Sequence, residues 1–308
     1  MVPLVLLCAV VLVNGWTDAP NAIATPVAAG VLSFPRAVVL AAVCNLLGTV
    51  CFTAVSDSVA RTLYSIADFG PNALPALSAA LGATVLWAVC AWRFGIPTSE
   101  SHALVAGLTG AALACGNGAL RWAPLAKVAV GLVLSLLLGW GLGRLSEALL
   151  PRRGAGFYAG GQVLGSALTA FLHGAQDGQK FLGVLALILS LSGPFVLPPW
   201  ATFLCAGLMA LGSLLGGKRI IDTVGRKMVL LTPRSGFAAD LGCALALALC
   251  SLWGLPVSTT HVKTAAILGA GSSADGRVVG SLFLAWALTF PCCGLLAFFL
   301  TKVFSFGL

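Results

Sequence analysis

The chain has 308 residues, of which 59% are hydrophobic and only 8% are charged, and its formal net charge is +8. A soluble domain carries about 25% charged residues, so this composition excludes an ordinary soluble globular protein and indicates a polytopic membrane protein. In a membrane chain, a positive net charge indicates basic cytoplasmic loops rather than a nucleic-acid-binding surface. We therefore expect the lipid bilayer as a partner and no nucleic acid.

Apolar segments follow one another along the chain and predict an all-α fold. Several are shorter than the roughly 20 residues that a spanning helix needs, and Gly, Pro and polar residues interrupt them. Such interruptions predict broken helices or re-entrant helical hairpins, whose irregular backbone is buried in protein or lines a cavity. The predicted segments are 2–13, 19–33, 36–56, 74–92, 97–115, 123–149, 156–173, 178–192, 196–215, 236–253, 256–271 and 278–305.

Two basic segments predict the orientation in the membrane. They are "LPRRG" at 150–154 and the stretch 217–235, which contains five Lys or Arg residues. Basic residues are enriched in cytoplasmic loops, so both segments are expected on the cytoplasmic side. In a bacterial-looking chain this predicts a multi-pass protein of the plasma membrane, the bacterial inner membrane.

An internal repeat divides the chain into two halves, 1–150 and 151–308. "NGWTD" at 14–18 matches "HGAQD" at 173–177, and "GIPTSESH" at 95–102 matches "GLPVSTTH" at 254–261. Each second motif begins 159 residues after its first copy (14 to 173, 95 to 254). Duplicated halves with paired interruptions are typical of secondary transporters, in which the interruptions form the binding site.

The orientation of the two halves depends on how many times each crosses the membrane. If 74–115 and 236–271 are hairpins with the Pro-Ser-His motifs at their tips, each half crosses three times and the repeats are inverted. If the hairpin arms cross fully, the repeats could be parallel. We favour inversion, which puts Arg36, Arg277 and both basic segments on one side and both chain termini on the other.

Asp18 and Asp177 are equivalent under the repeat and are candidate cation or proton sites. An ionisable group at membrane depth costs several kcal/mol unless it is paired or faces water. Each aspartate follows a glycine, Gly15 or Gly174, by three residues, and we expect the backbone to unwind there. Carboxylates with nearby carbonyl groups suit Na⁺ or a proton. Asp240 is a further candidate, or else the partner of a basic residue at a membrane edge.

Anion-binding groups accompany these carboxylates. Asn21 follows Asp18 by three residues, and Lys180 follows Asp177 by three. The proline that opens each Pro-x-Ser-x-x-His motif predicts that the preceding helix ends there and that the next helix begins within the motif. The hydroxyl groups are then N-caps or first-turn residues. Hydroxyl groups, free N–H groups and the positive end of a helix dipole form an anion cradle. The hydroxyl residues are Ser99, Ser101, Ser258, Thr259 and Thr260.

Two histidines and a glutamate lie in the same motifs. His102 and His261 are either hydrogen-bonded structural groups or proton-linked ones. Glu100 would repel an anion unless it were protonated or paired, with Arg93 as one partner, or it could itself carry a coupling proton. No metal-ligand spacing occurs among the ten cysteines, and we expect no cofactor.

The motifs "NGWTDAPNAIAT", "FLHGAQDGQKFLG", "GIPTSESHALVAG" and "GLPVSTTHVKTAAILGA" resemble the duplicated signatures of the inorganic phosphate transporter (PiT) family, in its bacterial branch with the HGxxDGQK motif. The resemblance implies a symporter that takes up phosphate, or a metal–phosphate complex, with H⁺ or Na⁺ by alternating access. The chain departs from the family pattern at Thr17, Pro20, Glu100 and Gln176. The residues that match positions expected to line the phosphate and cation sites are Asp18, Asn21, Ser99, Ser101, Asp177, Ser258, Thr259 and Thr260.

Three alternatives stay open from the residues. A permease of the same fold could carry sulfate or another tetrahedral oxyanion. An intramembrane enzyme could use Ser258 and His261 as nucleophile and base, but it would have no use for the duplication, so we expect no enzyme. A scaffold would gain nothing from the desolvation of carboxylates in both halves. A homo-oligomer is compatible with all of these.

Overall fold

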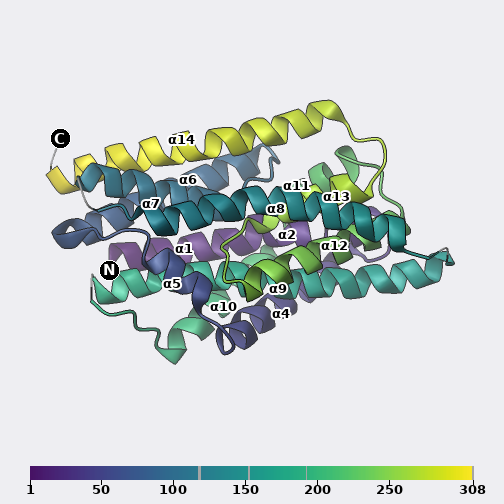
Figure 1. The fold of residues 1–308 in the computed structure, drawn as a ribbon, viewed down its shortest axis with the longest axis horizontal. Helices are drawn as coiled ribbons and strands as arrows, with labels where there is room; N and C mark the ends of the chain where they lie inside the picture. Colours follow the sequence, from purple (N-terminus) through teal and green to yellow (C-terminus); the bar gives the residue numbers. More distant parts are fainter. Residues whose placement is uncertain (117–118, 152, 192, 307–308) are drawn as a thin grey trace.

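The structure is a computed structural model that describes residues 1–116, 119–151, 153–191 and 193–306. Within these ranges the chain is helical, and its β structure is limited to the isolated bridges Ala67–Leu120 and Leu230–Ser272. The predicted all-α fold is therefore confirmed. Figure 1 shows helices lying side by side along the long axis of the molecule, with both chain termini at the same end.

The helices of the two halves correspond to one another in order. The first half contains α1 (Val2–Thr17), α2 (Ala19–Ala22), α3 (Ala24–Ala28), α4 (Phe34–Thr53), α5 (Ser58–Tyr64), the 3₁₀ turn η1 (Gly70–Asn72), α6 (Ala73–Arg93), α7 (Glu100–Cys115) and α8 (Trp122–Leu149). The second half contains α9 (Ala155–Ser190), α10 (Pro199–Leu215), α11 (Lys218–Asp222), the π-helical turn η2 (Thr223–Lys227), α12 (Pro233–Leu252), α13 (Thr259–Ala270) and α14 (Gly276–Phe306).

Six helices in the described part of the chain are long and apolar enough to cross a membrane, or seven if the bent pair 199–215 and 218–227 is one span. Among them are α6 and α12, the first arms of the two predicted hairpins. Each is followed by a shorter returning arm, α7 with 16 residues or α13 with 12 residues. The hairpins at 74–115 and 236–271 are therefore present, and each first arm has the length of a full span.

The two repeats are inverted. Figure 1 shows α8 running away from the end that holds both termini, whereas its equivalent α14 runs back to that end. Met1 and Phe304 line the same surface pocket there, and Glu147, near the far end of α8, pairs with Arg234 at the start of α12. Because the equivalent helices α8 and α14 run in opposite directions, the predicted inversion is confirmed.

The halves are intertwined rather than stacked. The returning arm α7 packs on α14 of the other half, and its equivalent α13 packs on α8. In the same way α4 packs on α9, and α10 packs on α1. Because each helix buries its apolar face against the opposite half, the two repeats form a single folding unit. The division between 1–150 and 151–308 falls in the connection between α8 and α9.

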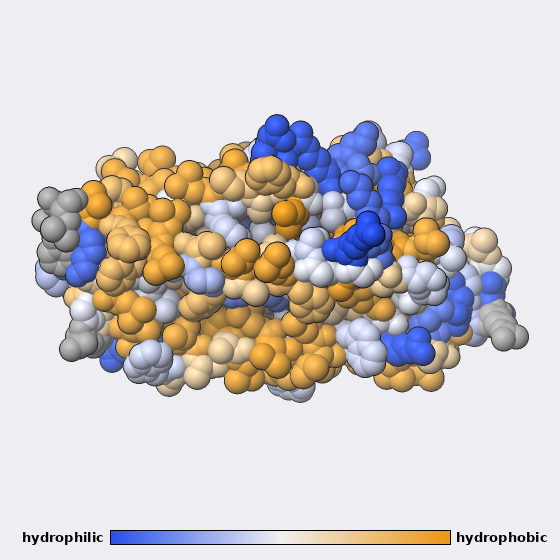
Figure 2. Space-filling view, turned by 90° about the horizontal axis from the view of Figure 1, so that it is seen from above, coloured by the Kyte–Doolittle hydropathy of each residue, from blue (hydrophilic) through white to orange (hydrophobic). Residues whose placement is uncertain are grey.

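The basic segments gather at the end opposite the termini. Arg234 at the start of α12 contacts the end of α8, and Arg219 lies over the ring of Trp92 near the end of α6. Figure 2 shows hydrophilic side chains concentrated over one half of the molecule and hydrophobic ones over the other. Arg152, in the segment 150–154, lies outside the described residues.

The continuous helix α9 (Ala155–Ser190) runs through both predicted segments, 156–173 and 178–192, so their separation was wrong. In the first half, the equivalent stretch breaks into α1, α2 and α3. The difference follows from two prolines, Pro20 and Pro26, which cannot donate a main-chain hydrogen bond and obstruct a helix. Their equivalents in α9 are Gln179 and Leu185, so that helix continues.

The expected unwinding at Gly15 and Gly174 is also wrong, because both glycines lie inside helices. A Cβ atom on Gly15 would lie 2.2 Å from the Met209 carbonyl oxygen, and one on Gly174 would lie 2.1 Å from the Asn45 carbonyl oxygen. The missing side chain allows close approach of neighbouring helices, which is how small residues act in membrane proteins. The glycines therefore set the packing of α1 on α10 and of α9 on α4.

Candidate functional site

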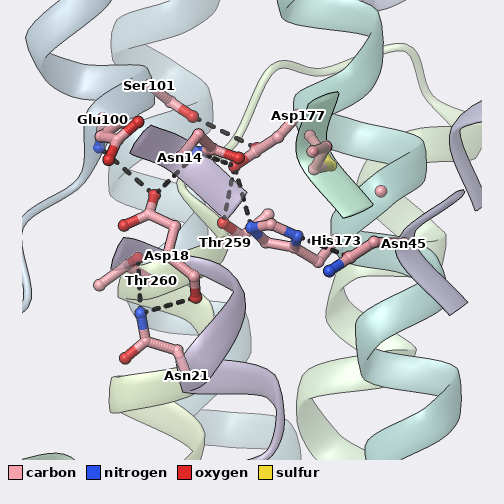
Figure 3. A network of polar contacts seen from close by, with 12 residues as sticks. Asn14, Asp18, Asn21, Asn45, Glu100, Ser101, His173, Asp177, Thr259 and Thr260 are labelled. Carbon is pink, nitrogen blue, oxygen red and sulfur yellow. Dashed lines mark hydrogen bonds and ion pairs between the residues drawn. The ribbon is translucent and has the colours of Figure 1, made fainter. Parts of the chain in front are cut away.

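Asp18 and Asp177, which are equivalent in the two repeats, lie close together in the interior of the protein. Asn14 Nδ2 lies 3.4 Å from Asp18 Oδ2 and 3.1 Å from Asp177 Oδ2. Figure 3 shows this amide between the two carboxylates, with the hairpin residues Ser101 and Thr259 beside Asp177. The end of α1, the middle of α9 and the tips of both hairpins therefore meet at a single site.

Asp177 receives contacts from both halves of the chain. Lys180 Nζ lies 2.6 Å from Oδ1 and Ser101 Oγ lies 3.3 Å from it. Thr259 Oγ1 lies 3.2 Å from Oδ2, and His173 Nε2 lies 3.3 Å from the same atom. A buried carboxylate needs such partners, because its desolvation is costly when it is unpaired. The Lys180 ammonium gives Asp177 a fixed counter-ion.

Asp18 has different partners. Its Oδ2 atom lies 3.4 Å from the main-chain nitrogen of Glu100, the first residue of α7, so the start of that helix faces the carboxylate. Glu100 Oε1 accepts a hydrogen bond from Thr17. Glu100 forms no ion pair within the part of the chain that the structure describes, so Arg93 as its partner was wrong. Among the described residues, neither Asp18 nor Glu100 forms an ion pair with a lysine or arginine.

Asn21 and Thr260 join the first half to the second hairpin. Asn21 Nδ2 lies 3.2 Å from Thr260 Oγ1 and 3.0 Å from the Asp18 carbonyl oxygen. Figure 3 shows both residues on the Asp18 side of the network. The amide therefore fixes the broken segment after α1 against the start of α13.

Ser99 and Ser258 begin the returning arms of the hairpins. Ser99 Oγ accepts a hydrogen bond of 3.2 Å from the His102 main-chain N–H, and Ser258 Oγ accepts one of 3.1 Å from that of His261. Both serines are therefore N-caps, as the motif predicts. A capping hydroxyl uses its oxygen as the acceptor and keeps its own hydrogen for another partner.

His102 and His261 lie next to each other but not next to the aspartates. Their ring centroids are 5.9 Å apart. His102 also packs on Phe290, and His261 packs on Trp286 with ring centroids 4.1 Å apart. Among the described residues, His102 Nδ1 and both ring nitrogens of His261 have no hydrogen-bond partner. The two repeats thus form an aromatic layer beside the polar site.

The site is closed to solvent and rich in carboxylates. Asp18 is 2% exposed, Glu100 1% and Asp177 0%, and Lys180 is 2% exposed. A cavity of about 10 Å³ adjoins Ser101 and Lys180, which is at the lower limit for one water molecule. The carboxylates of Asp18, Glu100 and Asp177 are therefore buried together, and the Lys180 ammonium lies beside Asp177.

Sequence reasoning missed three residues of this network: Asn14, Thr17 as a hydrogen-bond donor, and His173. Asn14 and His173 are equivalent at the 159-residue offset, so the repeat itself carried the signal. Ligand atoms of His173, Asp18 and Asp177 all lie within 4.8 Å of one another. This group could hold a cation, since carboxylate and imidazole groups are common cation ligands.

Asp240 belongs to a second buried ion pair, away from this network. Its carboxylate accepts hydrogen bonds from Lys263, from Thr25 Oγ1 at 2.6 Å and from Ser166 Oγ at 2.9 Å. Sequence reasoning did not single out Lys263. The pair and its two hydroxyl donors connect α12 and α13 to α3 and α9. Of the two roles predicted for Asp240, the structure therefore shows that of partner to a basic residue.

The family model described as "Phosphate transporter family" matches the chain twice, over residues 14–153 and 146–297. The chain belongs to the phosphate transporter family. Both matches contain one copy of each polar motif, so the family pattern is duplicated as the 159-residue repeat is. Members of this family are transporters rather than enzymes, and the chain is a multi-pass protein of the plasma membrane.

Individual relatives extend over almost the whole chain. The chain is 32% identical over 324 residues to the "Probable low-affinity inorganic phosphate transporter" of Bacillus subtilis, covering 97% of both chains. It is 37% identical over 303 residues to the protein of that name from Rhizobium meliloti, covering 92% of this chain and 90% of that one. A solved structure entitled "The sodium-dependent phosphate transporter" shares the fold, with a TM-score of 0.87, 22% identity and 98% coverage of both chains.

Proposed function

We propose that this member of the phosphate transporter family is a secondary active symporter that takes up inorganic phosphate with H⁺ or Na⁺ by alternating access. The observation that carries the proposal is the buried site in which Asp18 and Asp177, from the two repeats, meet through Asn14. The names of the family and of its relatives support phosphate as the substrate.

The starts of two helices provide the anion-binding groups. The N-termini of α7 and α13 open onto the site, and their free N–H groups and dipoles favour a negative charge. Lys180 adds the positive charge of its ammonium, which attracts a phosphate anion to the site. We assign phosphate binding to Asn21, Ser99, Ser101, Lys180, Ser258, Thr259 and Thr260.

The charge of the site explains why an anion would need a cation beside it. Asp18 and Glu100 are buried without a fixed counter-ion, so bringing phosphate next to them would add uncompensated negative charge in a dry site. Protons or Na⁺ that bind with phosphate remove this cost. We assign cation or proton coupling to Asp18, Asp177 and Glu100, with Na⁺ positions at the two aspartates.

The adjoining histidines are candidates for a proton-linked role. His102 and His261 are neighbours that come from equivalent positions of the two repeats. Their ring nitrogens without described partners are free to bind a proton or a water molecule. Exchange of a proton between this aromatic layer and the carboxylates would connect it to coupling.

Inverted repeats support alternating access. Because the halves are related by inversion and meet at the site, exchange of their conformations would open the site first to one side and then to the other. The closed arrangement of the site corresponds to an occluded stage between the two. The cargo is free phosphate or a metal–phosphate complex, with no resident cofactor, and a homo-oligomer stays a prediction.

Uptake of radiolabelled phosphate into proteoliposomes tests the proposal. Imposed H⁺ and Na⁺ gradients, applied separately, should show which ion drives accumulation, and Asp18→Asn and Asp177→Asn should abolish it in folded protein. Absence of uptake under both gradients would contradict the proposal. Stronger inhibition of uptake by unlabelled sulfate than by unlabelled phosphate would favour the second candidate, a permease for sulfate or another tetrahedral oxyanion.

A further inference from the structure

Three oxygen atoms from three different segments hold the Lys180 ammonium. Its Nζ atom lies 2.6 Å from Asp177 Oδ1 and 2.7 Å from Ser101 Oγ, and it donates to the main-chain carbonyl of Val257. Main-chain carbonyls coordinate Na⁺ in transporters, and carboxylates and carbonyls are the usual ligands of hard cations. The ammonium therefore occupies a position at which the protein has the oxygen donors to hold a small cation.

The repeat gives this cation position a twin in the first half. Asn21 Nδ2 lies 3.2 Å from Thr260 Oγ1, which reproduces the contact between Lys180 Nζ and Ser101 Oγ at equivalent positions of the repeat. Both contacts join a residue of one half, Asn21 in α2 or Lys180 in α9, to the hairpin of the other half. The twins of Asp177, Ser101, Val257 and Lys180 are Asp18, Thr260, Thr98 and Asn21.

The two positions differ in charge. Lys180 carries a positive charge, whereas the Asn21 amide is neutral and its Oδ1 atom is buried without a hydrogen-bond partner among the described residues. Asp177 thus has a counter-ion built into the chain, and Asp18 does not. A cation bound beside Asp18 must come from solution.

We propose that the Lys180 ammonium is a tethered cation that permanently fills one of two repeat-related cation positions, so that it sets how many cations are carried with each substrate. The proposal rests on the proposed symport function. Lys180 is covalently attached to α9 and cannot leave with the substrate. With Lys180 in place, only the Na⁺ position at Asp18 is therefore open to a mobile cation, and the one at Asp177 opens when Lys180 is replaced by a neutral residue. A chain with a neutral residue at this position would need one further mobile cation, Na⁺ or H⁺, beside Asp177.

Lys180→Asn tests this directly, because it copies the residue of the twin position. Asparagine is shorter than lysine, so the substitution enlarges the cavity of about 10 Å³ that Lys180 lines and leaves space for a cation. The membrane potential at which net phosphate flux in proteoliposomes reverses gives the number of cations per phosphate. We expect one more cation per phosphate than in the unmodified protein, and one fewer in Asn21→Lys. An unchanged stoichiometry in Lys180→Asn would overturn the proposal.

Cation binding without substrate gives a readout that does not need transport. The melting temperature of Lys180→Asn should rise with Na⁺ at fixed pH, or with acidification in the absence of Na⁺, by more than that of the unmodified protein. The two titrations identify which cation enters. If Lys180→Asn does not fold, Lys180→Gln takes its place, and absence of an additional cation response in the folded variant contradicts the proposal.

A matched control variant completes the experiment, and its outcomes distinguish failure of the tethered cation from failure of the proposed symport function. Thr109→Val removes a buried hydroxyl that, among the described residues, donates to the Val105 carbonyl oxygen of the same helix. This variant should keep the stoichiometry and the cation response of the unmodified protein. If the unmodified protein transports no phosphate under either gradient, the symport function fails. If it transports phosphate but Lys180→Asn keeps its stoichiometry, only the tethered cation fails.

Discussion

Asn14 Nδ2 lies 3.1 Å from Asp177 Oδ2, so that an amide of the first repeat contacts a carboxylate 163 residues away in the second. The same nitrogen lies 3.4 Å from Asp18 Oδ2. A neutral amide can donate both of its hydrogens without adding charge. Asn14 therefore holds two buried carboxylates close together while leaving their charge available for cations.

Asn14→Leu should strongly reduce phosphate uptake. The change leaves both carboxylates without this donor, and a buried polar group that loses its partner costs about 1–3 kcal/mol. We expect the initial rate of uptake in proteoliposomes to fall about tenfold or more, since 1.4 kcal/mol corresponds to a factor of about ten. Thr109→Val is the matched control. Equal rates for the two variants would show that the Asn14 contact is dispensable.

Ser258→Gly separates capping from substrate binding. Glycine replaces a serine N-cap at a cost of only a few tenths of a kcal/mol, so the melting temperature should change little. If the Ser258 hydroxyl also donates to phosphate, the KM for phosphate should rise about tenfold or more, since a hydrogen bond to a charged group contributes about 1.5–3 kcal/mol. A KM equal to that of the unmodified protein would reduce Ser258 to a cap.

The Asp240–Lys263 pair should contribute little net stability while being costly to break. The equivalent positions in the first half are Leu81 and Leu104, both buried in an apolar core. Asp240→Leu or Lys263→Leu alone leaves a buried charge unpaired and should lower the free energy of unfolding by about 3–5 kcal/mol. The double variant should recover most of this loss.

Thermal unfolding of the three variants in detergent completes this double-mutant cycle. The Thr25 and Ser166 hydroxyl groups lose their acceptor in the double variant, so a residual decrease of about 1–3 kcal/mol is expected. If the double variant is as unstable as the sum of the single ones, the two charges do not compensate each other. Phosphate uptake by the double variant then reports whether the pair has a role beyond folding.

Gly174→Ala should destabilise the protein, whereas Gly160→Ala in the same helix should not. A Cβ atom at 174 would lie 2.1 Å from the Asn45 carbonyl oxygen, whereas nothing lies within 4 Å of one at 160. Overpacking costs about 1–3 kcal/mol, and alanine is the better helix former by about 1 kcal/mol. The melting temperature should fall for Gly174→Ala and stay level or rise for Gly160→Ala. An unchanged melting temperature in both variants would show that α9 and α4 can move apart without loss of stability.

The repeat and its polar motifs were legible in the sequence because each rests on local chemistry. The offset of 159 residues identifies Asp18 and Asp177 as equivalent residues. The serines of the hairpin motifs are caps because their hydroxyl oxygens accept hydrogen bonds from free N–H groups at a helix start. Pro20 and Pro26 are a local signal for the broken segment of the first half, but unwinding was instead expected at Gly15 and Gly174, which both lie inside helices.

The tertiary structure decided which groups pair. Whether a glycine unwinds a helix or lets another backbone approach depends on what lies opposite, and Met209 and Asn45 come from helices distant in sequence. In the same way, the partner of Glu100 is Thr17 and the partner of Asp240 is Lys263, which no local pattern specifies.

The sequence by itself determined the membrane class, the all-α fold, the duplication and the residues that bear charge, since these depend on composition and on spacing along the chain. Only the tertiary structure decided that the repeats interlock and that Lys180 reaches Asp177, Ser101 and Val257. The physical reason is that buried charges choose partners by position in space, and inverted, intertwined repeats bring together segments that are far apart in the chain.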